Sequence, residues 1–263
     1  TSALVSNLHY GDQVMTILDN VVSGLNTLYE NSRLVVDSNG RIDGLTVDGG
    51  TLAVNGGVVG ETSGTNVVSG QMQVVSGSAY NTTVSGTGQV TASGNSTLHN
   101  TSIADGGEVI LNDSAQSSTT TVNDGGSFTV NDTAVADNTT VGKGGLFVVN
   151  SGGIASNSVI NDGGQMTADT ATITGAIVNN GGKMTLSAST ASDVALGDGG
   201  ILESSTGTTL TNLSANAGSI LNLSADTLLS GSLLMDVDVN ASGSDLDFAN
   251  LFTANNTLSS LTV

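Results

Sequence analysis

Several residue types are absent or scarce in this chain of 263 residues, which contains no cysteine, no proline and no tryptophan. Without cysteine the chain forms no disulfide bond and no thiolate metal site, and it can pass through an oxidising compartment without cross-linking. Aromatic residues make up 3% and charged residues 10% of the chain, against about 25% charged in ordinary domains. The core is therefore thin, and order depends on the regular placement of the 37% of residues that are hydrophobic.

Basic residues are also scarce, since Arg33, Arg41, Lys143 and Lys183 stand against 23 acidic residues, for a net charge of −19. They form no cluster that could neutralise phosphates, which excludes nucleic acid and anionic membrane surfaces as expected partners. No apolar run approaches the 18 residues or so of a membrane span, and TSALVSNLHYGDQ at the start lacks the pattern of a signal peptide. We expect a mature or excised fragment without an anchor of its own.

An internal repeat runs from residue 12 to residue 222. Each copy has a turn residue, which we call its anchor, just before an alternating apolar run. The anchors are 18–20 residues apart and are Asp12, Ser32, Gly50, Gly70, Gly88, Gly107, Gly126, Gly145, Gly164, Gly182, Gly200 and Gly218. The residue two positions after the anchor is apolar in all twelve copies. Such short segments bury their apolar faces only by stacking on neighbouring copies. This predicts an all-β fold, a right-handed parallel β-helix (β-solenoid) of about twelve rungs of 18–20 residues. The leucine-rich repeat has a similar period, but it has several leucines and an asparagine at fixed positions of each repeat, and this pattern is missing here.

Paired glycines recur at 49–50, 106–107, 125–126, 144–145, 163–164, 181–182 and 199–200. We interpret each pair as a turn that needs positive φ, where a Cβ is costly. A phosphate-binding loop is the alternative, but no following helix and no Lys-Ser/Thr completes that motif.

Two polar columns accompany the repeat. Asn81, Asn100, Asn138 and Asn157 lie seven positions before their anchors, and we expect them to form a structural asparagine ladder. Acceptors for N-linked glycans are the alternative interpretation of the same asparagines.

Before the glycine pairs stands a second column, in which Lys143 replaces aspartate. We expect Lys143 to pair with Asp124 and Asp162 and to relieve repulsion, at about 0–1 kcal/mol per exposed pair. Calcium binding is a rival role for the aspartates, but the nine-residue calcium repeat is absent. The candidates for self-association or surface ladders are Asp105, Asp124, Lys143, Asp162, Asp198, Arg33 and Arg41.

Catalytic motifs are not found. His9 and His99 lie ninety residues apart outside any metal motif, and no GxSxG elbow occurs. A polysaccharide-degrading β-helix is the enzymatic alternative, with the pairs Asp236/Asp238 and Asp245/Asp247 as its carboxylates, but the basic residues that would hold an acidic sugar are scattered. We expect no catalytic residue, no metal and no cofactor.

The segments NTTVSGTGQVTASGN, NTSIADGGEVILNDSA, TTTVNDGGSFTVNDTAVADN and NTTVGKGGLFVVNSGGIASN resemble the repeats of AIDA-type self-associating autotransporter adhesins of Gram-negative bacteria. The resemblance covers residues 45–205 well and 12–44 and 206–222 more loosely. It departs from the family where Gln71, Gln89 and Gln165 precede methionine or valine instead of an aromatic residue, and no C-terminal membrane barrel is present.

This resemblance implies a secreted passenger displayed at the outer membrane, which mediates autoaggregation, biofilm formation and, in some members, virulence through host-cell adhesion. It also implies heptose on serine or threonine as a candidate modification. On this basis residues 1–222 are the solenoid, with 1–11 as a candidate N-terminal cap. Residues 223–263 break the period and are irregular final rungs, a C-terminal cap or the start of an autochaperone region.

Three functions are consistent with the sequence. The first is homotypic self-association between cells, through weak contacts that sum along the solenoid and that the charge of −19 opposes. Arg33 and Arg41 could then meet the C-terminal aspartates of another copy. The second is binding of a host glycan or protein receptor, for which exposed tyrosines are needed, and the third is an inert spacer.

Overall fold

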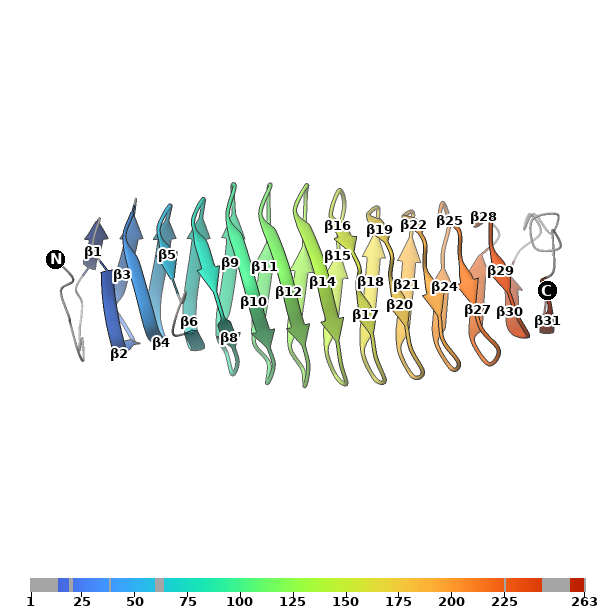
Figure 1. Cartoon of the computed structure of the whole chain (residues 1–263), viewed down its shortest axis with the longest axis horizontal. Coiled ribbons are helices and arrows are strands. Elements are labelled where there is room, and N and C mark those ends of the chain that lie inside the picture. The colour runs from blue at the N-terminus through green and yellow to red at the C-terminus, as the bar shows by residue number, and fades with distance from the viewer. Residues whose placement is uncertain are drawn as a thin grey trace. The chain divides into compact units, whose positions relative to one another are not determined.

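A computed structural model describes residues 14–18, 21–37, 39–59, 64–224, 226–242 and 256–262. It divides into two compact units, residues 1–137 and 138–263, and each is built from short β-strands (Figure 1). The strands of the first unit are β1 (Val14–Leu18), β2 (Val21–Tyr29), β3 (Arg33–Asp37), β4 (Arg41–Asn55), β5 (Val58–Val59), β6 (Thr65–Val75), β7 (Ser78–Tyr80), β8 (Thr82–Val84), β9 (Gln89–Ser93), β10 (Thr97–Ile103), β11 (Glu108–Leu111), β12 (Gln116–Val122) and β13 (Ser127–Val130).

In the second unit each turn of the chain contributes three strands, which we assign to a first, a second and a third face. The first face comprises β15 (Leu146–Val149), β18 (Gln165–Asp169), β21 (Lys183–Ser187), β24 (Ile201–Ser204), β27 (Ile220–Ser224), β30 (Val237–Ser242) and β31 (Leu258–Thr262). The second face comprises β16 (Ile154–Ser156), β19 (Thr172–Thr174), β22 (Thr190–Ser192), β25 (Thr209–Thr211) and β28 (Leu228–Ser230). The third face comprises β17 (Val159–Ile160), β20 (Ile177–Val178), β23 (Ala195–Leu196), β26 (Ser214–Ala215) and β29 (Leu233–Leu234). The strand β14 (Val135–Val141) spans the boundary of the two units.

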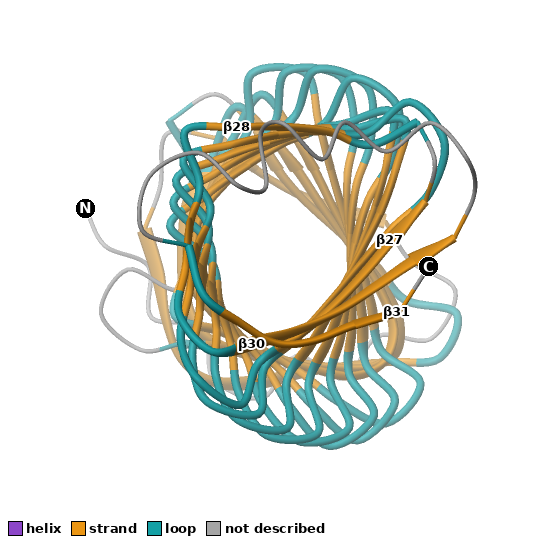
Figure 2. Ribbon diagram, turned by 90° about the vertical axis from the view of Figure 1, so that its right-hand side faces the viewer, coloured by secondary structure: helices purple, strands orange, loops and turns teal. Residues whose placement is uncertain are grey.

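Successive turns pair in parallel, so that equivalent residues lie beside each other. In the first unit Val109 is opposite Val90 on one side and Phe128 on the other, and in the second unit Met166 is opposite Phe147 and Met184. These residues are fully buried, which places the predicted apolar column in the core. Within each unit strands superpose on strands and loops on loops (Figure 2). The prediction of a right-handed parallel β-helix is confirmed, with about 11 turns.

Each glycine pair has two different roles, which corrects the expectation that the pair as a whole needs positive φ. The first glycine of the pair 106–107 has a φ of 86°, whereas Gly107 does not lie in the left-handed region. A Cβ on Gly107 would lie 2.4 Å from the carbonyl oxygen of Val84 in the preceding turn. The second glycine is therefore required by close approach of two turns, and only the first by backbone conformation.

The C-terminal segment continues the stacking before it becomes irregular. Strands β28, β29 and β30 pair in register with β25, β26 and β27 of the preceding turn. The last strand, β31, pairs with β30 across a register shift between Val237 and Asp238. Residues 1–11 and the predicted carboxylate pair Asp245/Asp247 lie outside the described residues.

Candidate interaction surfaces

The predicted aspartate column lies on exposed turns in the first unit. Asp105 has a φ of 52° and Asp124 a φ of 43°, and each is followed by a glycine whose φ is also positive. Two consecutive positive φ values define a type I′ turn, and aspartate adopts this conformation more readily than most residues. The Asp105 N–H donates to the carbonyl oxygen of Asp124 at 2.9 Å, which ties one turn to the next.

The turns that carry Lys143, Asp162 and Asp198 in the second unit have a different conformation. There only the following glycine has positive φ, as in a type II turn, and the glycine N–H makes the bond to the next turn, from Gly144 to Gly163 at 3.0 Å. A type II turn accepts any side chain at its first central position, so lysine fits at 143 without strain. Backbone conformation thus permits lysine in this turn, as it permits aspartate in the turns of Asp162 and Asp198.

Lys143 forms no ion pair with Asp162 among the contacts of the described side chains, although both are exposed and their turns are hydrogen-bonded neighbours. The expected pairing with Asp124 joins residues of the two units and stays a prediction. Arg33 is exposed at the start of β3, and Arg41 is half-buried at the start of β4, both in the first unit. Their expected contact with C-terminal aspartates of another copy also stays a prediction.

The four predicted asparagines lie at exposed corners and share one backbone conformation. Asn81, Asn100, Asn138 and Asn157 have φ values of 49°, 54°, 55° and 54°. The Nδ2 of Asn100 donates to the Oδ1 of Asn81 at 2.7 Å, so these two side chains are hydrogen-bonded along the stack, and Thr119 takes the next position of the column. Asparagine thus supplies both the left-handed corner and an amide for the ladder. The repeat pattern identified the column but not the corner, which the preference of asparagine for positive φ could have indicated.

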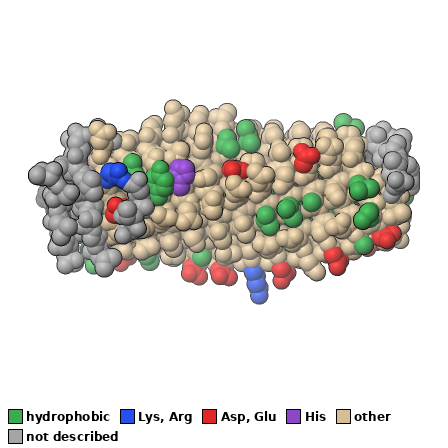
Figure 3. All heavy atoms as spheres, in the orientation of Figure 1, with side chains coloured by type: hydrophobic (Ala, Val, Ile, Leu, Met, Phe, Trp, Pro, Cys, Tyr) green, Lys and Arg blue, Asp and Glu red, His purple; other side chains and the backbone are tan. Residues whose placement is uncertain are grey.

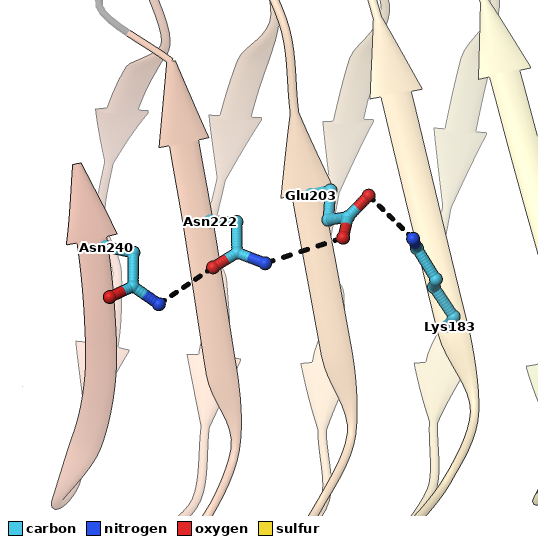
Figure 4. A network of polar contacts seen from close by, with 4 residues as sticks. All are labelled: Lys183, Glu203, Asn222 and Asn240. Atoms are coloured by element: carbon cyan, nitrogen blue, oxygen red, sulfur yellow. Dashed lines mark hydrogen bonds and ion pairs between the residues drawn. The ribbon is translucent and has the colours of Figure 1, made fainter. Parts of the chain in front are cut away.

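A second ladder, which the repeat pattern did not indicate, crosses four strands of the first face (Figure 4). The Nζ of Lys183 lies 2.8 Å from the Oε2 of Glu203, and the Oε1 of Glu203 accepts from Asn222 at 3.5 Å. Asn222 in turn accepts from the Nδ2 of Asn240 at 2.9 Å. An open groove of about 440 Å³ lies beside this ladder, lined by Glu203, Ser204, Asn222, Leu223, Asn240, Ala241 and Thr262. The first unit has a shorter equivalent, in which Gln89 donates to Glu108 at 2.7 Å.

An aromatic stack stands on the outer surface of the first unit. The rings of Tyr80 and His99 are 4.7 Å apart at 15°, and His99 Nδ1 lies 2.8 Å from the Oγ of Ser118. A small groove of about 170 Å³ adjoins this pair and is also lined by Asp137. Ser118 lies on a flat strand rather than on a sharp strand-to-helix turn, so the pair lacks the setting of a hydrolase nucleophile.

Metal sites and membrane-spanning helices were looked for among the described residues as well. Among them, no group of three or more histidine, cysteine, aspartate or glutamate side chains is placed to hold a metal ion. The part of the chain that the structure describes also contains no helix long and apolar enough to span a membrane.

No protein-family model matches this chain, and no curated protein matches it. Among solved structures, the chain is similar to the crystal structure of the TibC-catalysed hyper-glycosylated TibA55-350 fragment. The TM-score is 0.55 at 21% sequence identity, and the alignment covers 90% of this chain and 97% of the fragment. At this identity the likeness shows a shared β-solenoid fold.

Proposed function

We propose that this chain is the passenger of a bacterial adhesin, displayed at the cell surface, which joins cells by contacts between copies of itself. The observation that carries the proposal is the repetition of outward polar groups in register, of which the column of Thr172, Thr190 and Thr209 is one case. The resemblance of the repeats to AIDA-type passengers and the fold shared with the TibA fragment support it.

Weak contacts suffice for such a function. An exposed hydrogen bond contributes only about 0.5–1.5 kcal/mol, but a solenoid repeats the same donor or acceptor on every turn. Many copies on two facing cells then add their contacts by multivalency. Since the chain carries a net charge of −19, we expect association to increase with salt, which screens repulsion beyond about 8 Å at physiological ionic strength.

The test is display of the chain on bacteria that do not otherwise aggregate, followed by settling of the culture and by microscopy. Residues 1–263 are displayed by fusion to an outer-membrane translocator, and the control is this translocator without residues 1–263. We expect settling that requires the chain on both partners in a mixed culture of labelled and unlabelled cells. Cells that stay dispersed at every salt concentration, with a purified chain that sediments as a monomer, would leave the spacer as the better interpretation.

One observation favours a second candidate, which is binding of a host glycan. The Tyr80–His99 stack and its adjoining groove offer ring edges and hydroxyl groups on one surface. Tyr80→Ala would then reduce adhesion to host cells and leave settling unchanged. Binding of a host protein and an inert spacer role are less favoured, and polysaccharide degradation is the least favoured function.

The TibA fragment is described as hyper-glycosylated, and we propose sugar attachment to exposed hydroxyls of this chain as well. Thr170 and Thr206 are exposed candidates in the turns between the first and the second face. Intact mass of the chain, purified with and without a co-expressed glycosyltransferase, tests this proposal, and equal masses would contradict it.

A further inference from the structure

One surface of the second unit differs from the rest in its charge. It consists of the outward residues of the second and third faces, and we call it the neutral surface. Its members are Ile154, Ser156, Thr172, Thr174, Thr190, Ser192, Thr209, Thr211, Leu228 and Ser230 on the second face, and Val159, Ile177, Ala195, Ser214 and Leu233 on the third. None of these residues is charged.

The charged residues that the structure describes in this unit lie elsewhere, with one exception. They occupy the glycine turns, the first face and its border: Lys143, Asp162, Asp169, Lys183, Asp198, Glu203, Asp226, Asp236 and Asp238. The exception is Asp193, at the corner where the second face meets the third. Its Oδ1 accepts from the Nδ2 of Asn212 at 3.1 Å.

The neutral surface combines regular hydroxyls with exposed aliphatic side chains. Strand pairing places Thr172 beside Thr190 and Thr190 beside Thr209, so that one column of hydroxyls and methyls extends over three successive turns. Ile177 is 42% and Leu228 51% exposed, which is high for such large apolar side chains. In Figure 3 the surface over β17, β20 and β23 is accordingly mostly tan, with a group of green side chains.

Charge decides which partner this surface fits. Two copies with a net charge of −19 repel each other wherever their acidic turns or first faces meet. The neutral surface lets two copies approach with Asp193 as the one carboxylate that each of them brings, and it buries isoleucine and leucine side chains in doing so. We infer that a second copy of this chain docks on the neutral surface. This inference rests on the proposed self-association and names its interface.

The area of the neutral surface predicts a weak contact. Five turns at about 4.8 Å give a length of roughly 24 Å, and a three-residue strand, a corner and a two-residue strand give a width of roughly 20 Å. The resulting area of about 480 Å² per partner is below the value of about 800 Å² per partner that stable complexes bury. A single pair therefore dissociates readily, and stable association needs many copies.

Disulfide trapping tests the interface directly, because the chain contains no cysteine of its own. Thr190→Cys places one thiol in the middle of the neutral surface, and Thr185→Cys places one on the first face as the matched control. Under a mild oxidant we expect Thr190→Cys to form a covalent dimer at least about tenfold faster, because docking raises the effective concentration of its thiol. Equal rates for the two purified variants would overturn the inference.

Charge variants separate the interface from the function. Thr172→Asp with Thr209→Asp adds two charges to the neutral surface, and Thr167→Asp with Thr185→Asp adds two to the first face. We expect only the first pair to abolish settling, while Asp193→Asn increases it, and circular dichroism checks that each variant is folded. If cells that display the Thr172→Asp/Thr209→Asp variant settle as well as wild-type cells do, the proposed interface is refuted, but the proposed function is not. Wild-type cells that do not settle, with trapping still specific to Thr190→Cys, refute the function and leave the interface standing.

Discussion

Substitution at the glycine pair 163–164 tests the two roles assigned to such pairs. A Cβ on Gly164 would lie 2.6 Å from the carbonyl oxygen of Val141 and 3.0 Å from its carbon. Since both are backbone atoms of the preceding turn, two turns must separate by about 0.5 Å against a spacing of about 4.8 Å. Overpacking of this kind costs about 1–3 kcal/mol, so we expect Gly164→Ala to lower the free energy of unfolding by that amount.

Gly163 provides the matched comparison, because its requirement is conformational. Its φ is 69°, and an added Cβ meets the flexible Lys143 side chain at 3.1 Å. Gly163→Ala should cost about 1–2 kcal/mol as a left-handed residue, and Gly163→Asn less than about 1 kcal/mol, because asparagine tolerates this conformation. Gly164→Asn should be at least as damaging as Gly164→Ala.

Urea unfolding of the four variants measures these costs, and hydrogen exchange locates them, since a repeat array can unfold turn by turn. In exchange we expect Gly164→Ala to reduce protection in the turn of Val141 as well as in its own. Two results would refute the division of roles between the two glycines. One is that Gly164→Asn is as stable as the wild type, and the other is that Gly163→Asn is no more stable than Gly163→Ala.

Three further predictions follow from single side chains. Thr139→Val should stabilise the second unit by about 1 kcal/mol in urea unfolding, because the Thr139 hydroxyl is buried without a hydrogen-bond partner; a loss of stability would contradict this. Asn100→Ala should destabilise by about 1–2 kcal/mol and Asn100→Gly by less, because alanine keeps neither the left-handed corner nor the bond to Asn81; equal losses would show that the corner does not matter. Lys143→Asp should leave the circular dichroism spectrum unchanged, since the type II turn accepts aspartate at Asp162, but should make sedimentation more dependent on salt; an unchanged salt response would remove the charge role of Lys143.

The fold could be predicted because a spacing of 18–20 residues recurs from residue 12 to residue 222. A residue such as Met166 is apolar two positions after its anchor, and parallel stacking places it between equivalent residues of the adjacent turns. Only the architecture in which equal positions become neighbours keeps such a column buried. The length of the repeat and the alternation of apolar and polar residues therefore suffice to predict the fold class and the residues that face the core.

The surfaces could be predicted less well, for reasons of geometry. Lys183 and Glu203 are twenty residues apart, two more than the repeat of 18 at this point, where Lys183 pairs with Ile201. Their contact is therefore diagonal between turns and appears in no single column. The neutral surface depends on how the strands are distributed over three faces, and its members alternate with buried residues along the sequence, so the sequence alone does not indicate it. In the turn of Lys143, the charge pattern of the sequence does not indicate the backbone conformation that admits lysine.

The constant register of the second unit makes its length a variable trait. Met166, Met184 and Leu202 occupy the same position of successive turns, and each lies beside the equivalent residue of the adjacent turn. Loss or gain of one repeat by recombination within the gene would remove or add a single turn of about 4.8 Å and restore the parallel strand pairing at the junction. The length of this solenoid can thus change in small steps during evolution, without any new kind of interaction between its turns.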